Sequence, residues 1–407
     1  MQRFRREDNP YTFQFSYIPP QYIERAGIIN GIISNYVREV PTYRGIFITG
    51  VRGSGKTVMM SDIRKQIGAR REWITIDLNP ESNLLESLVH NLYRDSQTKS
   101  LFLNTKLDLS AFGMGISVEK ASLSFNDEED ALRLMLQVLK KKKKKLLVTI
   151  DEITYSKDVA KFSHALSSCA SLGLDLYVLM TGLKENIDNI KNKKSLTFLY
   201  RAKVYPLETL NEFAISRDYQ STLDIDIDLA KLLAEKTKGY SLAFQAIGYH
   251  AWNIKCQSKV KETTINLDIL DRELDDSLSE MAYDKIWDEL SEKDKRILVA
   301  TVELCIMSGK EKIRVEDIRK KVKMTSDSFT TYRKRLIDAG VINGDTYGYF
   351  AFSLPRFEEY IKKTEEFRTE SIQAKPEIQL IIDYVELPED KQKRLLAYME
   401  KLKNIKH

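Results

Sequence analysis

The sequence has few cysteines and histidines, and their spacing argues against the metal sites that these residues usually build. Cys169, Cys256 and Cys305 lie far apart and form no CxxC pair. This spacing argues against both a zinc site and a disulfide framework, and it fits a reducing compartment. No HExxH-type pair exists either, which argues against a metal centre built from histidine and cysteine. The histidines are His90, His164, His250 and His407.

Long apolar runs and a dominant charge are also missing. No apolar stretch approaches the about 20 residues of a membrane-spanning helix, and no apolar segment of a signal peptide follows the basic start, MQRFRRED. Lys+Arg 64 against Asp+Glu 59 leaves a net charge of +5, too small to indicate nucleic-acid binding from composition alone. With 407 residues and 43% hydrophobic residues, we expect two or three folded domains in a soluble, cytoplasmic protein without a membrane partner.

What the sequence does contain is a glycine-rich loop between an apolar strand, residues 46–48, and an amphipathic helix. Residues 50–57 read GVRGSGKT and fit the phosphate-loop pattern GxxxxGK[ST]. Glycines let backbone amides surround phosphate oxygens, and the following helix points its positive end at them. Lys56 is expected to reach the β- and γ-phosphates, and the Thr57 hydroxyl to ligate Mg²⁺. The candidate nucleotide-binding residues are Gly50, Val51, Arg52, Gly53, Ser54, Gly55, Lys56 and Thr57.

A second apolar strand ends on two acids. Residues 146–150, LLVTI, form a mostly apolar stretch, and Asp151 and Glu152 follow directly. Asp151 is predicted to hold Mg²⁺, and Glu152 to polarise the attacking water as a general base. The alternative is two ordinary acids that cap a strand. The lysine run 140–145 before this strand indicates a solvated helix end at the opposite edge of the sheet, and only secondarily a nucleic-acid contact.

Two further residues are candidates for the same site. Thr181 ends the apolar segment LDLYVLMT and could sense the γ-phosphate or hold the lytic water; the alternative is a strand-end threonine bonded to backbone. Arg201 stands just before a fifth short strand, residues 203–207, and could stabilise the transferred phosphoryl group in its own subunit or a neighbour's. The alternative for Arg201 is a surface arginine.

Together, GVRGSGKT, LLVTIDE and FLYRAKVYPLETL resemble the AAA+ ATPases, specifically the archaeal-type and origin-recognition-like group that grades into the STAND signalling NTPases. The resemblance implies an α/β fold: a P-loop NTPase parallel sheet of five strands with a helical lid and a C-terminal winged-helix domain. It places the ATPase core in residues 1–207. Within the core, residues 1–43 contain a segment that lies across the adenine, where the family's Gly-Arg pair is replaced by Arg25-Ala26-Gly27.

The same resemblance divides the remainder of the chain. Residues 208–258 correspond to the lid, in which Gly239-Tyr240-Ser241 matches a Gly-x-Pro motif and makes Tyr240 a nucleotide-contact candidate. The lid helix SLAFQAIGYHAW lacks the nucleotide-sensing arginine of many relatives; an ordinary helical hairpin is the alternative. The spaced acids of DIDID, residues 224–228, fit a helix cap better than a Ca²⁺ loop. Residues 259–284 are expected to form a charged connector.

Residues 285–363 predict a winged helix-turn-helix. Ser291 caps a first helix, a third helix ends at Gly340, and a hairpin turns at Asn343-Gly344. A basic cluster on or before the third helix could neutralise DNA phosphates. In signalling relatives, the same domain instead packs on the ATPase as an autoinhibitory arm. The DNA-binding candidates are Lys321, Lys323, Arg333, Lys334 and Arg335, with Lys320 beside them.

Two segments have no assigned role. Residues 107–125 alternate polar and apolar positions and predict an inserted β-hairpin, and residues 364–407 predict a linker followed by an amphipathic helix. Either could contact a partner.

These features favour a Mg²⁺-dependent ATPase whose nucleotide state moves the winged helix. ATP and Mg²⁺ are the expected ligands. One hypothesis is action on, or recruitment to, double-stranded DNA. A second is a nucleotide-gated signalling or defence switch that binds a protein, and a third is a nucleotide-binding module with negligible turnover. A homo-oligomer is compatible with each of these hypotheses.

Overall fold

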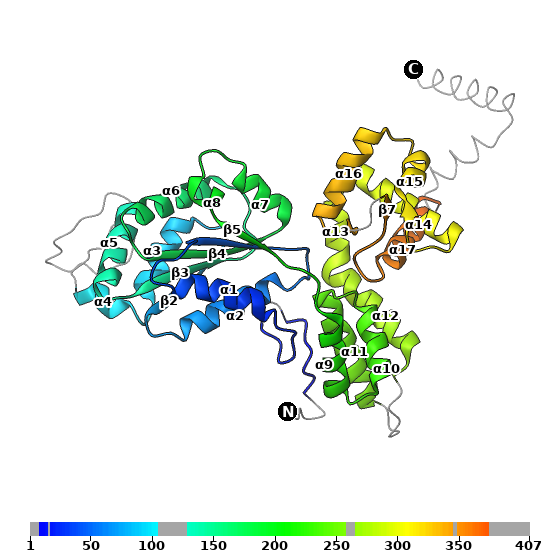
Figure 1. Ribbon diagram of the computed structural model, residues 1–407, viewed down its shortest axis with the longest axis horizontal. Coiled ribbons are helices and arrows are strands. Elements are labelled where there is room, and N and C mark those ends of the chain that lie inside the picture. The colour runs from blue at the N-terminus through cyan, green and yellow to red at the C-terminus, as the bar shows by residue number, and fades with distance from the viewer. Residues whose placement is uncertain (1–7, 15–16, 105–127, 258–264, 345–347, 374–407) are drawn as a thin grey trace, which may run out of the picture.

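The computed structural model describes residues 8–14, 17–104, 128–257, 265–344 and 348–373. The expected hairpin at 107–125 and the expected C-terminal helix lie outside these ranges. Within them, the chain forms an α/β core, a helical region and a C-terminal region of helices and short strands (Figure 1). No helix among the described residues is both long and apolar enough to cross a membrane.

The core is built on the expected five-stranded sheet. Its strand order is β2-β3-β4-β1-β5, and all neighbouring strands are parallel. Parallel strands place all of their carboxyl ends at one edge, so the loops after β1, β3 and β4 meet there. The strands are β1 (Gly45–Thr49), β2 (Trp73–Leu78), β3 (Lys145–Ile150), β4 (Leu176–Gly182) and β5 (Lys203–Pro206).

Helices cover both faces of this sheet, which explains why its central strands are apolar throughout (Figure 1). Ile46 and Ile48 of β1 pack with the helices of one face, and Phe47 packs with those of the other. The first face is covered by α1 (Ala26–Val37) and α2 (Lys56–Gly68). The second is covered by α3 (Leu84–Arg94), α4 (Lys99–Asn104), α5 (Glu128–Lys141), α6 (Lys157–Ser171), α7 (Lys184–Lys191) and α8 (Thr197–Tyr200).

The lysine run lies at the amino edge of the sheet, away from the loops after β1 and β3. Lys140 donates from Nζ to the Gly173 carbonyl at 2.9 Å, and Lys144 donates to the Arg71 carbonyl at 2.5 Å. Lys145 lies over the Trp73 ring, 5.6 Å from its centroid. These lysines therefore satisfy backbone carbonyls and aromatic faces around the start of β3, as expected for a solvated helix end.

Past the sheet, four helices pack together: α9 (Glu212–Leu223), α10 (Ile227–Lys236), α11 (Ser241–Gln257) and α12 (Leu267–Leu278). Asp226 caps α10 by accepting from the backbone N–H of Asp228 and Leu229. The fourth helix lies within the segment expected to be a connector. Its leucines Leu270, Leu274 and Leu278 are buried at a spacing of four residues, so this segment is a packed part of the helical region.

The C-terminal region contains the expected helices and a shifted hairpin. Ser291 and Asp294 form a capping box at the start of α14 (Glu292–Ser308). Ile342 pairs with Phe352, and the Asn343 N–H donates to the Ala351 carbonyl at 2.8 Å. Asn343 therefore belongs to the ladder and not to a turn, which corrects the prediction of a turn at Asn343-Gly344. The other elements are η2 (Ser279–Tyr283), α13 (Asp284–Glu289), β6 (Ile313–Arg314), α15 (Val315–Lys321), α16 (Ser326–Asp338), β7 (Tyr349–Phe350) and α17 (Phe357–Gln373).

This arrangement is consistent with a winged-helix domain. β6 pairs antiparallel with β7, and α16 lies where a reading helix is expected. The fold class predicted from the sequence is thus the one observed.

Candidate functional site

The glycine-rich loop joins the end of β1 to the start of α2 at the carboxyl edge of the sheet. Gly53 adopts φ +70°, and a Cβ placed on it would lie 2.2 Å from the Tyr240 hydroxyl oxygen. Both the backbone conformation and the close approach of the lid require glycine there. The Ser54 N–H donates to the Val51 carbonyl at 3.2 Å and closes the loop on itself.

Lys56 is buried in the centre of this loop. Its Nζ donates to the carbonyl oxygens of Gly50 and Val51, both at 2.9 Å. Burial lowers the pKa of the ammonium group to about 8, although the nearby carboxylates of Glu152 and Asp151 act in the opposite direction. A buried ammonium that bonds only carbonyls is well placed to bind an anion.

Backbone donors at the start of α2 also indicate an anion-binding site. Within the described residues, the backbone N–H groups of Gly53, Gly55, Lys56 and Thr57 have no hydrogen-bond acceptor. The Ser54 hydroxyl is buried and also lacks a partner there. Since these donors gather at the positive end of a helix of 13 residues, they form a site suited to phosphate oxygens.

The acids after β3 lie beside this loop. The Thr57 hydroxyl donates to Oδ2 of Asp151 at 2.7 Å, and the Thr181 hydroxyl donates to Oδ1 of the same carboxylate. The Glu152 N–H donates to Thr181 Oγ1 at 3.0 Å. Three strand ends thus bring together all four side chains that were predicted from separate parts of the sequence.

This donor set fits a magnesium ion that is shared with a nucleotide. No group of three or more His, Cys, Asp or Glu side chains in the described part of the chain could hold a metal by itself. Mg²⁺ is commonly held by one or two protein oxygens together with substrate phosphates. Asp151 and Thr57 supply such oxygens directly beside the phosphate loop.

Glu152 and Thr181 differ in accessibility. The Glu152 side chain is 54% exposed and pairs with Arg52 at 3.3 Å, so its carboxylate is turned toward solvent at the loop. Thr181 is fully buried, and its hydroxyl is occupied by Asp151 and the Glu152 N–H. In this arrangement, Thr181 fixes the orientation of the two acids; its expected part in sensing the γ-phosphate stays a prediction.

Arg201 does not join the site of its own chain. It follows α8 and precedes β5, whose first residue, Lys203, pairs with Ile46 near the start of β1. Arg201 therefore lies at the amino edge, a strand length of roughly 15–20 Å from the phosphate loop, and its side chain is too short to span that distance. Of the two alternatives left open for Arg201, this position does not support action in its own subunit; action on a neighbouring subunit stays a prediction.

The start of the lid helix α11 binds the outer side of the phosphate loop. The Tyr240 hydroxyl donates to the Arg52 carbonyl at 2.6 Å, and the Leu242 N–H donates to the Gly53 carbonyl at 3.0 Å. Ser241 donates to the Ser54 carbonyl at 2.9 Å. Tyr240 thus supports the loop backbone, and Ser241 is the residue of this turn that lines the adjoining pocket.

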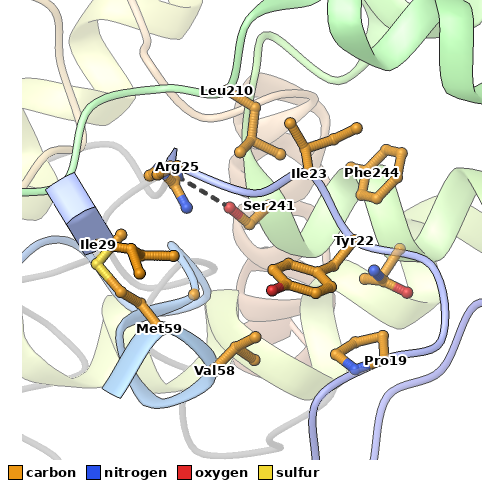
Figure 2. Close-up of a pocket in the computed structure, with 12 residues that line it drawn as sticks. Pro19, Tyr22, Ile23, Arg25, Ile29, Val58, Met59, Leu210, Ser241 and Phe244 are labelled. Atoms are coloured by element: carbon orange, nitrogen blue, oxygen red, sulfur yellow. Dashed lines mark hydrogen bonds between the residues drawn. The ribbon is translucent and has the colours of Figure 1, made fainter. Parts of the chain in front are cut away.

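That pocket lies between the N-terminal segment, α2 and α11 (Figure 2). Two aromatic rings, Tyr22 and Phe244, line it together with apolar side chains, which suits a flat base. The sequence indicated that the N-terminal segment would lie here, but it did not single out these side chains. The lining residues are Pro19, Tyr22, Ile23, Arg25, Ile29, Gly55, Val58, Met59, Leu210, Ser241, Phe244 and Gln245.

The N-terminal segment is held against the lid by polar contacts. The Gln245 side chain accepts from the Thr12 N–H at 3.0 Å and donates to the Gln21 carbonyl at 2.7 Å. The Tyr11 hydroxyl donates to Asp218 at 2.7 Å. The Tyr22 hydroxyl donates to Asp62 of α2 at 2.8 Å. This segment therefore connects the lid to the core along one wall of the pocket.

The basic residues predicted to bind DNA do not share one free surface. Lys321 pairs with Glu303 at 2.8 Å, and Arg335 pairs with the buried Asp294 at 3.2 Å. Lys320, beside them, pairs with Glu316 on its own helix at 2.7 Å. The remaining candidates are Lys323 and Lys334, both exposed, and Arg333, which is partly buried.

Arg333 lies in a different basic groove. Its Nη2 donates to the Tyr349 carbonyl at 3.4 Å, and Arg314 and Arg319 line the same groove. We call this set, Arg314, Arg319 and Arg333, the outer arginines. Arg314 and Arg319 could not be identified from the sequence, because they precede or belong to another helix and only the packing of β6, α15 and α16 brings them to Arg333.

The other side of α16 faces the α/β core. A Cβ on Gly340, just after this helix, would lie 1.8 Å from Cγ1 of Val51 in the phosphate loop. Lys184 of α7 pairs with Asp338 at 3.2 Å. Arg52, the partner of Glu152, also pairs with Glu289 of α13 at 2.5 Å. The winged-helix region therefore contacts the phosphate loop directly, beside a cavity of about 450 Å³.

Comparisons with known proteins agree with this architecture. Residues 280–361 match a family described as a domain of unknown function (DUF8462). No curated protein is similar enough in sequence to match the chain. The solved ORC2 protein of Aeropyrum pernix, in ADPNP-ADP complexes, is 14% identical with a TM-score of 0.57, over 88% of this chain and 98% of that chain. Cdc6p of Pyrobaculum aerophilum is 15% identical with a TM-score of 0.46, over 87% of this chain and 97% of that chain.

The similarity to the ORC2 structure establishes the fold. The chain has an origin-recognition-like AAA+ fold over most of its length. This agrees with the resemblance seen in the loop and strand-end motifs.

Proposed function

We propose that this AAA+-fold chain is a Mg²⁺-dependent ATPase. One observation carries the proposal: at the carboxyl edge of the sheet, Lys56, Thr57, Asp151 and Glu152 converge around unpaired backbone donors. Phosphoryl transfer needs positioning and charge stabilisation more than covalent chemistry from the protein, and these groups supply both.

Each residue has a distinct part in this proposal. The loop amides and the Lys56 ammonium bind the phosphate chain. Asp151 and Thr57 hold Mg²⁺, which neutralises charge on the phosphates when bound. Thr181 keeps the Asp151 carboxylate in place through its hydrogen bond. Glu152 accepts a proton from the attacking water once its carboxylate has left Arg52. Arg201 is available only to a neighbouring copy, which would make a homo-oligomer the complete enzyme.

The contact between the winged-helix region and the loop supports a nucleotide-dependent movement. Arg52 binds both the proposed base, Glu152, and Glu289 of α13. A phosphate anion in the loop offers Arg52 a third acceptor, and any shift of Arg52 loosens its pair with Glu289. ATP binding would then release the winged helix from the core. This contact favours a nucleotide-gated switch as the second candidate function.

Binding of double-stranded DNA is the use of the winged helix that we propose first. The outer arginines lie on the winged-helix region, on a different side from the contact with Val51. Their charges could neutralise several phosphates while Arg335 remains bound to Asp294. A protein partner on the released surface is the alternative, and it predicts no duplex binding at low salt.

Nucleotide binding by a Lys56→Ala variant tests the proposal. We expect ATP and ADP affinity to fall at least a hundredfold, because the variant loses the buried ammonium that faces the phosphates. Lys65→Ala on the exposed side of the same helix is the matched control and should bind normally. Isothermal titration with ATP and Mg²⁺ measures both. Unchanged ATP binding in Lys56→Ala would overturn the assignment of the site.

A further inference from the structure

Arg25 lies where the pocket, the phosphate loop and the lid meet. It precedes α1, and its guanidinium lines the pocket beside Ser241 (Figure 2). Its Nη2 donates to the Glu208 carbonyl at 2.9 Å and to the Ser241 hydroxyl at 3.2 Å. Glu208 lies between β5 and α9, and Ser241 begins α11. One side chain thus connects the beginning of the lid and the start of its helix α11 to the N-terminal segment.

The acceptors of Arg25 leave its charge uncompensated. Both are neutral oxygens, and within the described residues no carboxylate pairs with Arg25. Burial lowers the pKa of the guanidinium, and it is the only cause of the shift. A partly buried cation next to the positive end of α2 is unfavourable by itself, and an anion placed between them would relieve this cost.

The remaining nitrogen of Arg25 points to where that anion would bind. A Cβ built on Gly55 would lie 3.6 Å from Nη1, which makes no hydrogen bond in the described part of the chain. Gly55 also borders the aromatic pocket that suits the base. A group at this place lies between the base and the Lys56 ammonium, which is the position of the phosphate nearest the sugar.

We propose that Arg25 binds the α-phosphate of the nucleotide and couples nucleotide occupancy to the lid through Ser241 and Glu208. This inference rests on the proposed nucleotide site. It also accounts for a feature that the sequence left open: α11 begins with SLAFQAIGYHAW and offers no arginine of its own. The N-terminal segment supplies the cation, and the lid helix supplies only a hydroxyl acceptor.

The experiment compares AMP and ADP binding to the full chain and to Arg25→Met. Because AMP and ADP share the α-phosphate, the variant should lose about tenfold in affinity for each, the effect of one charge-assisted hydrogen bond. Lys56→Met should weaken ADP far more than AMP, because its ammonium reaches phosphates further from the sugar. Competition against a fluorescent ADP analogue measures all affinities.

A second readout separates coupling from binding. Saturating ADP should slow hydrogen exchange across α9 and α11 in the unchanged chain. In Arg25→Met saturated with ADP, this protection should be largely lost. Arg25→Lys keeps the charge but lacks the second nitrogen, Nε, that also donates to the Glu208 carbonyl at 3.3 Å, so it should recover affinity without recovering full lid protection.

Arg44→Met is the matched control. Arg44 is also a partly buried arginine that donates to a backbone carbonyl, that of Leu174, but it lies at the amino edge. Its loss should leave AMP and ADP affinity unchanged. If Arg25→Met binds AMP and ADP within twofold of the unchanged chain, or keeps full lid protection, the inference fails while the site around Lys56 stands. If the unchanged chain binds no ADP, the proposed function itself fails.

Discussion

The phosphate site and the winged-helix surface differ in how well the sequence predicts which side chains lie together. Around the phosphate loop, side chains separated by up to 94 positions come within hydrogen-bonding distance as their spacing predicts, as Thr57 and Thr181 do with Asp151. On the winged helix, neighbouring basic residues diverge: Arg335 lines a cavity beside the phosphate loop, whereas Arg333 lies in a groove on another side. The carboxyl ends of parallel strands always lie at the same edge of the sheet, whereas tertiary packing decides which face of a surface helix is exposed.

The largest effect is expected for Glu152→Gln in the phosphate site. We expect turnover to fall about 10²–10³-fold, because the amide cannot accept a proton from the attacking water. ATP affinity should stay within a few fold, since Glu152 is exposed and contacts Arg52, not the phosphate donors. Steady-state phosphate release and ATP titration measure the two quantities.

Glu72→Gln is the matched control for this change. Glu72 is exposed and lies just before β2, at the amino edge. It should keep full turnover. If the ATPase rate is unchanged in Glu152→Gln, Glu152 is not the general base, even though its position at the end of β3 was predicted correctly.

The contact between the two regions is tested by Gly340→Ala. The new methyl group would lie 1.8 Å from Val51 Cγ1, and Gly340 also has φ +68°. We expect the winged helix to separate from the core, with a loss of about 2–3 kcal/mol in the free energy of unfolding. Chemical denaturation measures the loss, and small-angle scattering should give a larger radius of gyration.

Gly309→Ala separates strain from contact. Gly309 has φ +64° but has no atoms near a built Cβ, so it should lose only about 1 kcal/mol and leave the shape unchanged. Val51→Ala combined with Gly340→Ala should recover the compact shape, since it removes the clashing methyl group. Equal effects of the two glycine variants would refute a contact at the loop.

How far the sequence could predict this molecule follows from these differences. Gly50–Thr57 and Asp151 were identifiable because a buried strand, a tight loop and a helix each leave a local pattern. Leu270, Leu274 and Leu278 also carry a helical pattern, but charged neighbours in the connector obscured it. For Arg201, the sequence left action in its own subunit or in a neighbour's open, because the position of a residue along the chain does not show at which edge of the sheet it lies. The sequence placed Arg25 in the segment near the adenine but not its contacts, and it did not identify Tyr22 and Phe244, since these come only from the docking of the N-terminal segment on the lid.

The pH dependence of nucleotide binding tests the electrostatics of Lys56. Its pKa in the free protein is about 8, lower than usual because of burial. Phosphates favour the ammonium form and raise this pKa, so binding above pH 8 requires uptake of a proton. ADP affinity should therefore be level with respect to Lys56 below pH 7 and fall about fivefold between pH 8 and pH 9. The number of protons taken up follows from titration calorimetry in buffers of different ionisation enthalpy.

Lys56→Met provides the control for that prediction. The variant binds ADP weakly, but its affinity should no longer fall above pH 8 through proton uptake at this position. If the variant takes up the same number of protons, the titrating group is not Lys56, and the electrostatic account of the phosphate loop is wrong.

The smallest expected effect concerns the outer arginines. If the winged helix binds duplex DNA, Arg319→Gln and Arg333→Gln should each weaken binding several-fold and lower the salt slope by about 1, because each removes one phosphate contact. Arg335→Gln should change affinity less than twofold, since Arg335 is held by the buried Asp294. Fluorescence anisotropy with a labelled duplex, from 25 to 200 mM salt, measures each slope. A larger loss in Arg335→Gln than in Arg333→Gln would show that α16 leaves the core before it binds DNA. In that case, the basic cluster predicted from the sequence contacts the phosphates, and the groove of the outer arginines does not.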